Sequence, residues 1–432
     1  MNKKTGEFAH FRSETGQIFH GWYIVAASAW TNAIGGSVQW QGFTVFFLPI
    51  ANSLGLSHAQ AALPFALARA ESGITGPIAG WLIDKYGVKP LMFIGTILTG
   101  IGYILLARTN SFLTFLLVYI FVISLGASTG FMQAASTSIN MWFVKYRGMA
   151  MSLNSAAFRL GGAFMVPLLS IVVLKYGWQT AAFWVGIGMV VLIAPSALVF
   201  KRSPESIGTG PDGEKLRPKK IDLKKPISSN ESTAEHDWTP RQAVKTSSFW
   251  TLALGTVLRM VVHGTIFIHF VPILVWKGES QQSAANMIGA MALISVPIIL
   301  IFGWFSDKFS RQKLMSGLYL SAGISLLMIN YVDGTWPIFL SMMLFIGTEV
   351  GSGLNWALVG DLFGRRHFAT IRGWLAPIYN IALIFGPVGA GFIKDQTNSY
   401  EIVLVAGFFL MVGASTTFFF LRKPKVKPYS NN

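Results

Sequence analysis

The stretch GWLIDKYG (80–87) occurs a second time in this chain, slightly changed, as GWFSDKFS (303–310). Each copy follows a long apolar run, and in each copy a glycine is followed four positions later by an aspartate and a lysine. Internal repeats in the two halves of a membrane-embedded chain are typical of transporters. The repeated stretch therefore predicts a duplicated membrane protein.

The composition indicates a protein that lies in a lipid bilayer. Of the 432 residues, 52% are hydrophobic and only 12% are charged, which is unusual for a soluble domain of this length. A helix needs about 20 apolar residues to cross the hydrocarbon core, whereas the strands of a membrane barrel are alternating segments of about 10 residues. The long unbroken runs therefore favour helices. They predict twelve spans, at about 22–50, 60–83, 91–107, 113–139, 148–173, 181–200, 250–275, 283–305, 314–330, 338–359, 371–393 and 402–421.

The twelve spans predict an all-α integral membrane fold made of two six-helix bundles. Residues 201–245, between the sixth and seventh spans, are rich in Lys, Ser, Pro and Glu and lack helical or strand periodicity, which is typical of a linker. Because the repeated stretch follows the second span of each half, the halves are expected to be parallel repeats. The predicted organisation is a cytoplasmic N-terminal tail (1–20), an N-terminal bundle (21–200), a cytoplasmic linker (201–245), a C-terminal bundle (246–422) and a cytoplasmic C-terminal tail (423–432).

The positive charges lie mainly on one side of this topology. The formal net charge is +16, and with the N-terminus in the cytoplasm the outer loops hold only Arg108, Lys175, Lys277 and Lys394. The positive-inside rule then places both termini in the cytoplasm. It also explains the excess of Lys and Arg over Asp and Glu, so no nucleic-acid partner is needed to account for it. The first twenty residues have no apolar core, so the first span is expected to direct insertion without a cleaved signal peptide. The sequence predicts a multi-pass protein of the plasma (inner) membrane.

The repeated stretch resembles the hallmark of the major facilitator superfamily, Gly-x-x-x-Asp-Arg/Lys-x-Gly-x-Arg/Lys between the second and third helices. The resemblance covers the chain apart from its tails and linker. It implies a secondary transporter whose two halves rock about a central site. The loops at 142–150 and 361–373 are similar to those of the monocarboxylate and oxalate:formate branch. The matching residues are Gly80, Asp84, Lys85, Gly87 and Lys89 in the first copy and Gly303, Asp307, Lys308 and Arg311 in the second, where Ser310 replaces the second glycine.

The glycines and aspartates of the motif predict a latch between the halves. Gly80 and Gly303 lack side chains, so another helix can approach closely. Asp84 and Asp307 lie near the predicted N-termini of the eleventh and fifth helices, whose partial positive charge favours a carboxylate. The alternative for the motif cations is that they only set the topology. The predicted gating latch comprises Gly80, Asp84, Lys85, Gly303, Asp307 and Lys308.

Five ionisable residues near the middle of predicted spans indicate a central site: Arg69, Glu71, Arg159, Arg259 and Glu349. A charge at a helix centre costs roughly 2.5–3.5 kcal/mol even on the mildest insertion scale. Pairing of Arg259 with Glu349, or of Arg159 with Glu71, is the alternative to a binding role. Three arginines against two glutamates leave at least one guanidinium for an anionic substrate, which binds through two parallel hydrogen bonds.

The candidate site residues are polar groups within these spans. The resemblance implies that the first, fourth, seventh and tenth helices line the cavity, which makes Arg259 the first candidate. His263 lies one turn beyond Arg259 on the same face, and histidine titrates near neutral pH. The predicted substrate ligands are Arg259, Arg69, Arg159, Gln39, Gln133 and Asn355, and the predicted proton-coupling groups are Glu349, Glu71 and His263.

The sequence departs from the carboxylate-carrier branch at two places. The resemblance implies an arginine on the eighth helix and, in the oxalate branch, a lysine on the eleventh. Residues 283–305 and 373–393 contain no cation, and Arg372, at the edge of the eleventh span, is counted with the cytoplasmic cations. A preference for carboxylates therefore depends on the arginines of the other spans.

These features predict a secondary active transporter that moves a small organic anion, first of all a monocarboxylate, by alternating access with proton coupling or exchange. One alternative is a proton-coupled carrier or exporter of a neutral or amphipathic compound, and another is a membrane receptor or scaffold that moves no solute. The sequence contains no nucleotide loop, metal-ligand cluster or nucleophile motif, so neither an enzyme nor a cofactor is expected. The expected partners are the substrate, protons and the lipid bilayer, and the expected state is a monomer.

Overall fold

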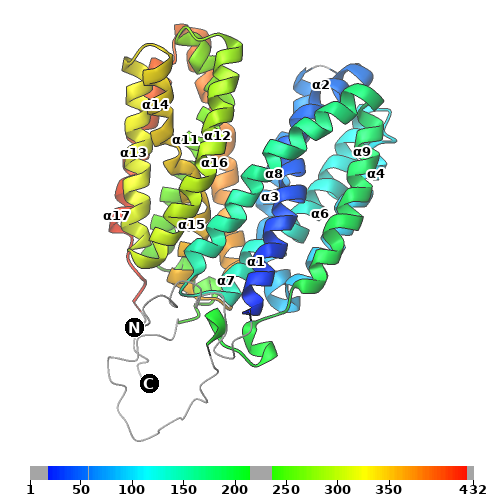
Figure 1. The fold of residues 1–432 in the computed structure, drawn as a ribbon, viewed down its shortest axis with the longest axis vertical. Helices are drawn as coiled ribbons and strands as arrows, with labels where there is room; N and C mark the ends of the chain where they lie inside the picture. The colour runs from blue at the N-terminus through cyan, green and yellow to red at the C-terminus, as the bar shows by residue number, and fades with distance from the viewer. Residues whose placement is uncertain (1–17, 57, 215–235, 426–432) are drawn as a thin grey trace, which may run out of the picture.

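The computed structural model describes residues 18–56, 58–214 and 236–425, and this part of the chain is built from helices (Figure 1). Ten of its helices are long and apolar enough to cross a membrane. Together with the helical stretches 20–53 and His58–Tyr86, they make the twelve segments that the sequence predicts. The all-α fold class is thereby confirmed.

The N-terminal half holds the first six segments, and its first, fourth and sixth segments include π-helical turns. In order they are α1 (His20–Thr31) with η2 (Asn32–Gly36), η3 (Val38–Gly42) and α2 (Phe43–Ser53); α3 (His58–Tyr86); α4 (Val88–Leu106); α5 (Phe112–Val118) with η4 (Tyr119–Ser124), α6 (Leu125–Ala127), η5 (Ser128–Met132) and α7 (Ala134–Trp142); α8 (Arg147–Tyr176); and α9 (Trp178–Gly188) with η6 (Met189–Ile193) and η7 (Ala194–Val199).

The C-terminal half repeats this arrangement, without π-helical turns in its described segments. Its segments are α11 (Ser247–Trp276), α12 (Gln281–Lys308), α13 (Arg311–Tyr331), α14 (Thr335–Phe345) with α15 (Gly347–Phe363), α16 (Phe368–Thr397) and α17 (Glu401–Phe420). The segment between the halves contains three short helices where the sequence shows no helical periodicity. They are η8 (Pro204–Ile207), η9 (Pro211–Gly213) and α10 (Pro240–Val244).

The turn after the repeated stretch explains why its two copies differ. Gly87 lies at the end of α3 with φ of 87°, a conformation that favours glycine because it has no Cβ. In the second copy, Phe309 and Ser310 have φ of −115° and −61°. The chain therefore passes from α12 to α13 without a positive φ, and a serine fits there.

The two halves touch at one end of the molecule, which we call the linker side because residues 200–214 and α10 lie there. At this end α3 packs along α16 and α8 packs along α12, and the halves separate toward the opposite end, the far side (Figure 1). A Cβ on Gly80 would collide with the backbone of Ala369, and one on Gly303 would collide with the side chain of Ser152. The contact between the halves therefore requires the first glycine of each copy.

Candidate functional site

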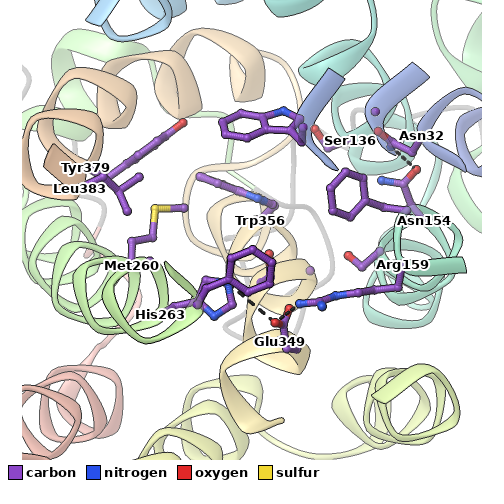
Figure 2. Close-up of a pocket in the computed structure, with 18 of the residues that line it drawn as sticks. Asn32, Ser136, Asn154, Arg159, Met260, His263, Glu349, Trp356, Tyr379 and Leu383 are labelled. Carbon is purple, nitrogen blue, oxygen red and sulfur yellow. Dashed lines mark hydrogen bonds and ion pairs between the residues drawn. The ribbon is translucent and has the colours of Figure 1, made fainter. Parts of the chain in front are cut away.

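A cavity of about 450 Å³ lies between the two halves. Its walls come from the first helical segment, α3, α7 and α8 on one side and from α11, α15 and α16 on the other, with polar groups and aromatic rings mixed (Figure 2). Among the described residues, the lining includes one carboxylate, Glu349, and four arginines. They are Arg69, Arg159, Arg259 and Arg372. The cavity therefore carries an excess of positive charge.

One ion pair joins the two halves inside this cavity. Arg159 of α8 donates to the carboxylate of Glu349 in α15, and both side chains are largely buried (Figure 2). Nε2 of His263 lies 3.7 Å from the same carboxylate, and its Nδ1 lies 3.1 Å from the hydroxyl oxygen of Thr348. Three ionisable groups from three helices therefore meet at one point.

Neither of the pairings within one half that the sequence leaves open as an alternative is present among the described residues. Glu349 pairs with Arg159 and not with Arg259. The carboxylate of Glu71 accepts hydrogen bonds from the hydroxyls of Ser124 and Thr75, both at 2.7 Å, inside the N-terminal half. The reason is that α8 and α15 face each other across the cavity, and this relation between helices is not visible in spacing along one helix.

Arg259 is the most buried arginine of the cavity, with 2% of its surface exposed. Its Nη1 donates to the carbonyl oxygen of Thr348 at 3.3 Å, and its buried Nε has no hydrogen-bond partner in the described part of the chain. No carboxylate of a described residue pairs with it. Its remaining hydrogen-bonding capacity is therefore available to an anion in the cavity.

Two further arginines stack on tryptophans. The guanidinium carbon of Arg69 lies 3.8 Å from the ring centre of Trp40, and that of Arg372 lies 4.3 Å from the ring centre of Trp356. Such stacking fixes the guanidinium plane and leaves its edge for hydrogen bonds. Arg372 also donates to the hydroxyl of Ser136, so it links α16 to α7 across the two halves.

Arg372 is a cavity-lining arginine that sequence reasoning misses. The predicted eleventh span starts at residue 371, and Arg372, at its edge, is counted with the cytoplasmic cations. The structure begins α16 at Phe368, so Arg372 lies inside the helix and lines the cavity. Knowing where α16 starts would have revealed Arg372. That start depends on Asp84, far away in the sequence, which accepts hydrogen bonds from the first amides of the helix.

Three residues predicted for the site do not line the cavity, namely Glu71, described above, and two amides. The side chain of Gln39 accepts a hydrogen bond from the hydroxyl of Tyr103 at 3.1 Å. Asn355, fully buried, accepts one from the hydroxyl of Thr256 at 3.1 Å. Each amide therefore joins helices within its own half. By contrast, Gln133 lines the cavity, and its buried Oε1 has no partner among the described residues.

Both motif aspartates lie at a helix N-terminus of the other half. The carboxylate of Asp84 accepts hydrogen bonds from the amides of Ala369 (3.3 Å) and Thr370 (2.9 Å) at the start of α16. The carboxylate of Asp307 accepts them from Gly148 (2.7 Å) and Met149 (2.8 Å) at the start of α8. These are the interhelical contacts that a latch on the linker side requires.

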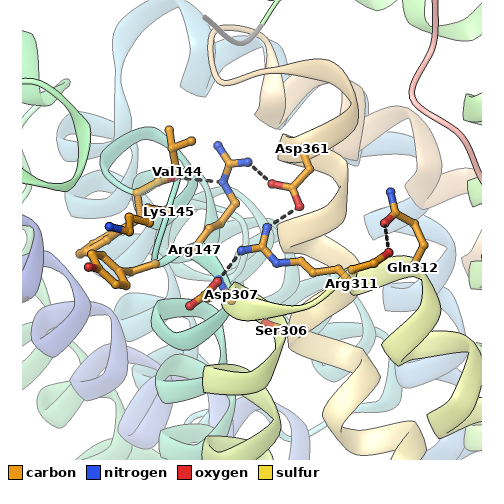
Figure 3. A network of polar contacts seen from close by, with 12 residues as sticks. Val144, Lys145, Arg147, Ser306, Asp307, Arg311, Gln312 and Asp361 are labelled. Carbon is orange, nitrogen blue, oxygen red and sulfur yellow. Dashed lines mark hydrogen bonds and ion pairs between the residues drawn. The ribbon is translucent and has the colours of Figure 1, made fainter. Parts of the chain in front are cut away.

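The contact made by Asp307 is reinforced by a network of largely buried charges (Figure 3). Arg311 donates to Asp307 at 2.5 Å and also to Asp361 at the end of α15. Asp361 in turn accepts from Arg147 at 2.5 Å, at the start of α8. Arg311 therefore belongs to the contact between the halves and does more than set topology. No arginine pairs with Asp84 among the residues described, so the contacts of the two aspartates are unequal.

The lysines of the motif take no part in these contacts. The Nζ atom of Lys85 lies 4.7 Å from the ring centre of Trp81, and that of Lys308 lies 3.4 Å from the ring centre of Trp304. Both tryptophans are about half exposed. These two lysines therefore fit the alternative role of topology-setting charges.

Comparison with known proteins shows which family this geometry belongs to. The family model described as Major Facilitator Superfamily matches residues 25–387 and 278–432. The chain is 24% identical over 430 residues to monocarboxylate transporter 2 of Mesocricetus auratus, with 94% of this chain and 86% of that protein covered. It is 26% identical over 399 residues to the oxalate:formate antiporter of Oxalobacter formigenes, with 89% and 86% covered.

The fold is similar to that of a solved transporter of the same superfamily, FucP in the outward conformation. The TM-score is 0.72 with 14% sequence identity, and the match covers 93% of this chain and 98% of that one. At this identity the likeness concerns the fold alone. The family match, the repeated halves and the central cavity agree: the chain is a multi-pass secondary transporter, not an enzyme, and it belongs to the Major Facilitator Superfamily.

Proposed function

We propose that this transporter carries a small organic anion, first of all a monocarboxylate, through its central cavity. The main support is that Arg69, Arg259 and Arg372 line the cavity and have no carboxylate partner among the described residues. A guanidinium binds a carboxylate through two parallel hydrogen bonds, and a buried cation without a counterion is unfavourable. Relatives named for monocarboxylates and for oxalate and formate support the same class of substrate.

The contacts between the halves suggest which step of the transport cycle the structure represents. The positive-inside rule places the linker side in the cytoplasm. The halves touch on that side and separate on the far side (Figure 1), which corresponds to an outward-facing arrangement in the plasma (inner) membrane. To release substrate inward, the carrier must break the contacts of Asp84 and Asp307 with α16 and α8. We therefore assign these two aspartates the role of gating latch.

Glu349 is our candidate for the proton site. It is the only carboxylate among the described residues that line the cavity, and its partners Arg159 and His263 come from the two different halves. Protonation of Glu349 would remove the ion pair that joins the halves at this point. Proton binding is therefore coupled to rearrangement of the halves.

Glu349→Gln is expected to abolish the stimulation of uptake by an inward proton gradient, because glutamine keeps the shape and the acceptor oxygen but does not titrate. Exchange of labelled for unlabelled substrate at symmetric pH requires no net proton movement and should continue. Both rates are measured in proteoliposomes. Full gradient stimulation in the variant would place the proton site elsewhere.

The experiment that tests the proposed function is uptake by the purified transporter in proteoliposomes. The panel contains formate, acetate, pyruvate and oxalate, together with a neutral sugar and an amphipathic amine, each with and without a pH gradient. Saturable uptake or exchange of at least one carboxylate supports the proposal. Uptake of a neutral or amphipathic compound alone overturns it in favour of the alternative carrier, and binding of a carboxylate without movement favours a receptor.

A further inference from the structure

The hydroxyl of Tyr379 is a polar group of the cavity that makes no hydrogen bond to a described residue. Tyr379 lies on α16 and lines the cavity, and no hydrogen bond joins its hydroxyl to another described residue. Its ring lies 6.0 Å from that of Trp356. Arg372 is seven residues away, about two helical turns, so both side chains are on the same face of α16.

Three guanidinium groups surround this hydroxyl. Arg69, Arg259 and Arg372, from three different helices, line the same cavity as Tyr379, and the guanidinium of Arg372 stacks on Trp356, the ring next to that of Tyr379. These are the three cavity arginines without a carboxylate partner in the described part of the chain, whereas Arg159 is occupied by Glu349. Figure 2 shows Tyr379 on one side of the pocket and the ion pair on the other, with Trp356 between them.

We infer that Tyr379 is a substrate-binding residue and that the acidic group of the substrate binds between its hydroxyl and Arg69, Arg259 and Arg372. This inference rests on the proposed function and locates the anion within the cavity. The phenol O–H donates to an oxygen of the carboxylate that the arginine forks leave free. In this conformation Arg159 belongs to the proton-coupling group on the opposite side and is not a substrate ligand.

Tyr379→Phe is expected to raise KM for the transported carboxylate roughly tenfold, as removal of a hydrogen bond to a charged group does. The rate of exchange at saturation should change less than twofold, because phenylalanine keeps the packing against Trp356. The matched control is Tyr319→Phe. Tyr319 is fully buried, donates to the carbonyl oxygen of Gly351 at 3.3 Å and does not line the cavity. Its replacement should leave KM within twofold of the unchanged protein.

Two outcomes separate this inference from the proposed function. If Tyr379→Phe leaves KM unchanged while Arg259→Ala abolishes carboxylate binding, the inference is wrong and the proposed function stands. If the unchanged protein binds none of the carboxylates, the proposed function fails first. A rise in KM in Tyr379→Phe with equal loss of saturated rate would indicate a role in folding or gating and would also contradict the inference.

A second, independent observation concerns the segment between the halves. The carboxylate of Asp212 accepts hydrogen bonds from the amides of Val144 (3.0 Å) and Lys145 (2.8 Å). The carboxylate of Asp237 accepts them from the amides of Arg365 (2.8 Å) and Arg366 (3.0 Å). These two turns come directly before α8 and α16, the helices whose first amides are held by Asp307 and Asp84.

An ion pair from the same segment crosses between the halves. Glu205 in η8 accepts from Arg365 at 2.9 Å, and Arg365 also donates to the carbonyl oxygen of Met141 at 2.7 Å. Burial alone would raise the pKa of Glu205, but hydrogen bonds from its own amide, from Ser203 and from Arg365 lower the pKa below its usual value. The segment therefore contacts both halves on the linker side.

We propose that Asp212 and Asp237 form a clasp that stabilises the conformation closed on the linker side. Asp212 fixes the turn before α8, and Asp237 fixes the turn before α16. The start of each of these helices is therefore bound by two aspartates, one from the motif and one from the clasp. The segment between the halves thus has a conformational role beyond that of a tether.

The Asp212→Asn, Asp237→Asn double variant is expected to open the linker side more often. The chain contains no cysteine, so a single Ser152→Cys reports on this side: Ser152 is fully buried against Gly303 in the closed form. Its alkylation rate should rise at least fivefold in the double variant. Asp333→Asn, an exposed residue paired with Lys277 at 2.6 Å on the far side, is the control. An alkylation rate within twofold of the control overturns the proposal.

Discussion

Asp307→Asn is expected to reduce transport at least tenfold and to shift the carrier toward the form that is open on the linker side. Asp307 accepts from two amides of α8 and from Arg311, and all these partners are largely buried. Breaking a buried ion pair by removing one partner costs about 3–5 kcal/mol. The pair with Arg311 lies within the C-terminal half, whereas the two amide contacts with α8 join the halves, so the loss of these charge-assisted hydrogen bonds, about 1.5–3 kcal/mol each, falls on the closed form. Its population relative to the open form should drop by about a hundredfold.

The test combines transport with alkylation of the Ser152→Cys reporter. Asp84→Asn is the matched control, because Asp84 also holds two helix amides, at 3.3 and 2.9 Å, but no arginine pairs with it in the described part of the chain. The control should lose less transport and show slower alkylation than Asp307→Asn. Equal effects of the two variants would show that the network of Arg311, Asp361 and Arg147 adds nothing to the latch.

The architecture could be predicted from the sequence because its signals are local and repeated. Twelve apolar runs and two copies of one motif specify the number of helices and their division into halves. The difference between Gly87 and Ser310 follows from the backbone, since only the first turn needs a positive φ. The short helices between the halves were not predictable, because they depend on contacts with residues far away in the sequence. Asp212 of η9, for example, accepts hydrogen bonds from the amides of residues 144–146.

The site could be predicted only in part, because a charge in a span shows that a partner is needed and not which partner it is. Arg259 lines the cavity as expected. The sequence offers Arg259, in the same half, as an alternative partner of Glu349, whereas the structure brings Glu349 to Arg159 across the cavity. Gln39 and Asn355 show the same limit. A polar residue in an apolar helix either bonds a neighbouring helix or faces the cavity, and the rotation of the helix about its axis, which the sequence does not show, determines which of the two occurs.

Arg259→Ala is expected to lower kcat/KM for the transported carboxylate by at least a hundredfold. Arg259 is 2% exposed, it lines the cavity, and its Nε has no partner among the described residues. Its loss removes a charge and up to two hydrogen bonds to the anion, and hydrogen bonds to charged groups contribute about 1.5–3 kcal/mol each. Binding is measured by titration calorimetry in detergent, and transport is measured by exchange in proteoliposomes.

Arg259→Lys and Glu71→Gln separate charge, geometry and folding in this experiment. Lysine keeps the charge but not the planar fork, so it should recover only part of the affinity. Glu71→Gln changes a charge buried in the N-terminal half, bonded to Ser124 and Thr75 and away from the cavity lining, and should bind substrate within twofold of the unchanged protein. Full activity of Arg259→Lys would mean that the positive charge at this position is sufficient and that the anion makes no bidentate contact with it. Unchanged binding in Arg259→Ala would remove the main support for an anion in this cavity, since the arginine most deeply buried there would then have a structural role.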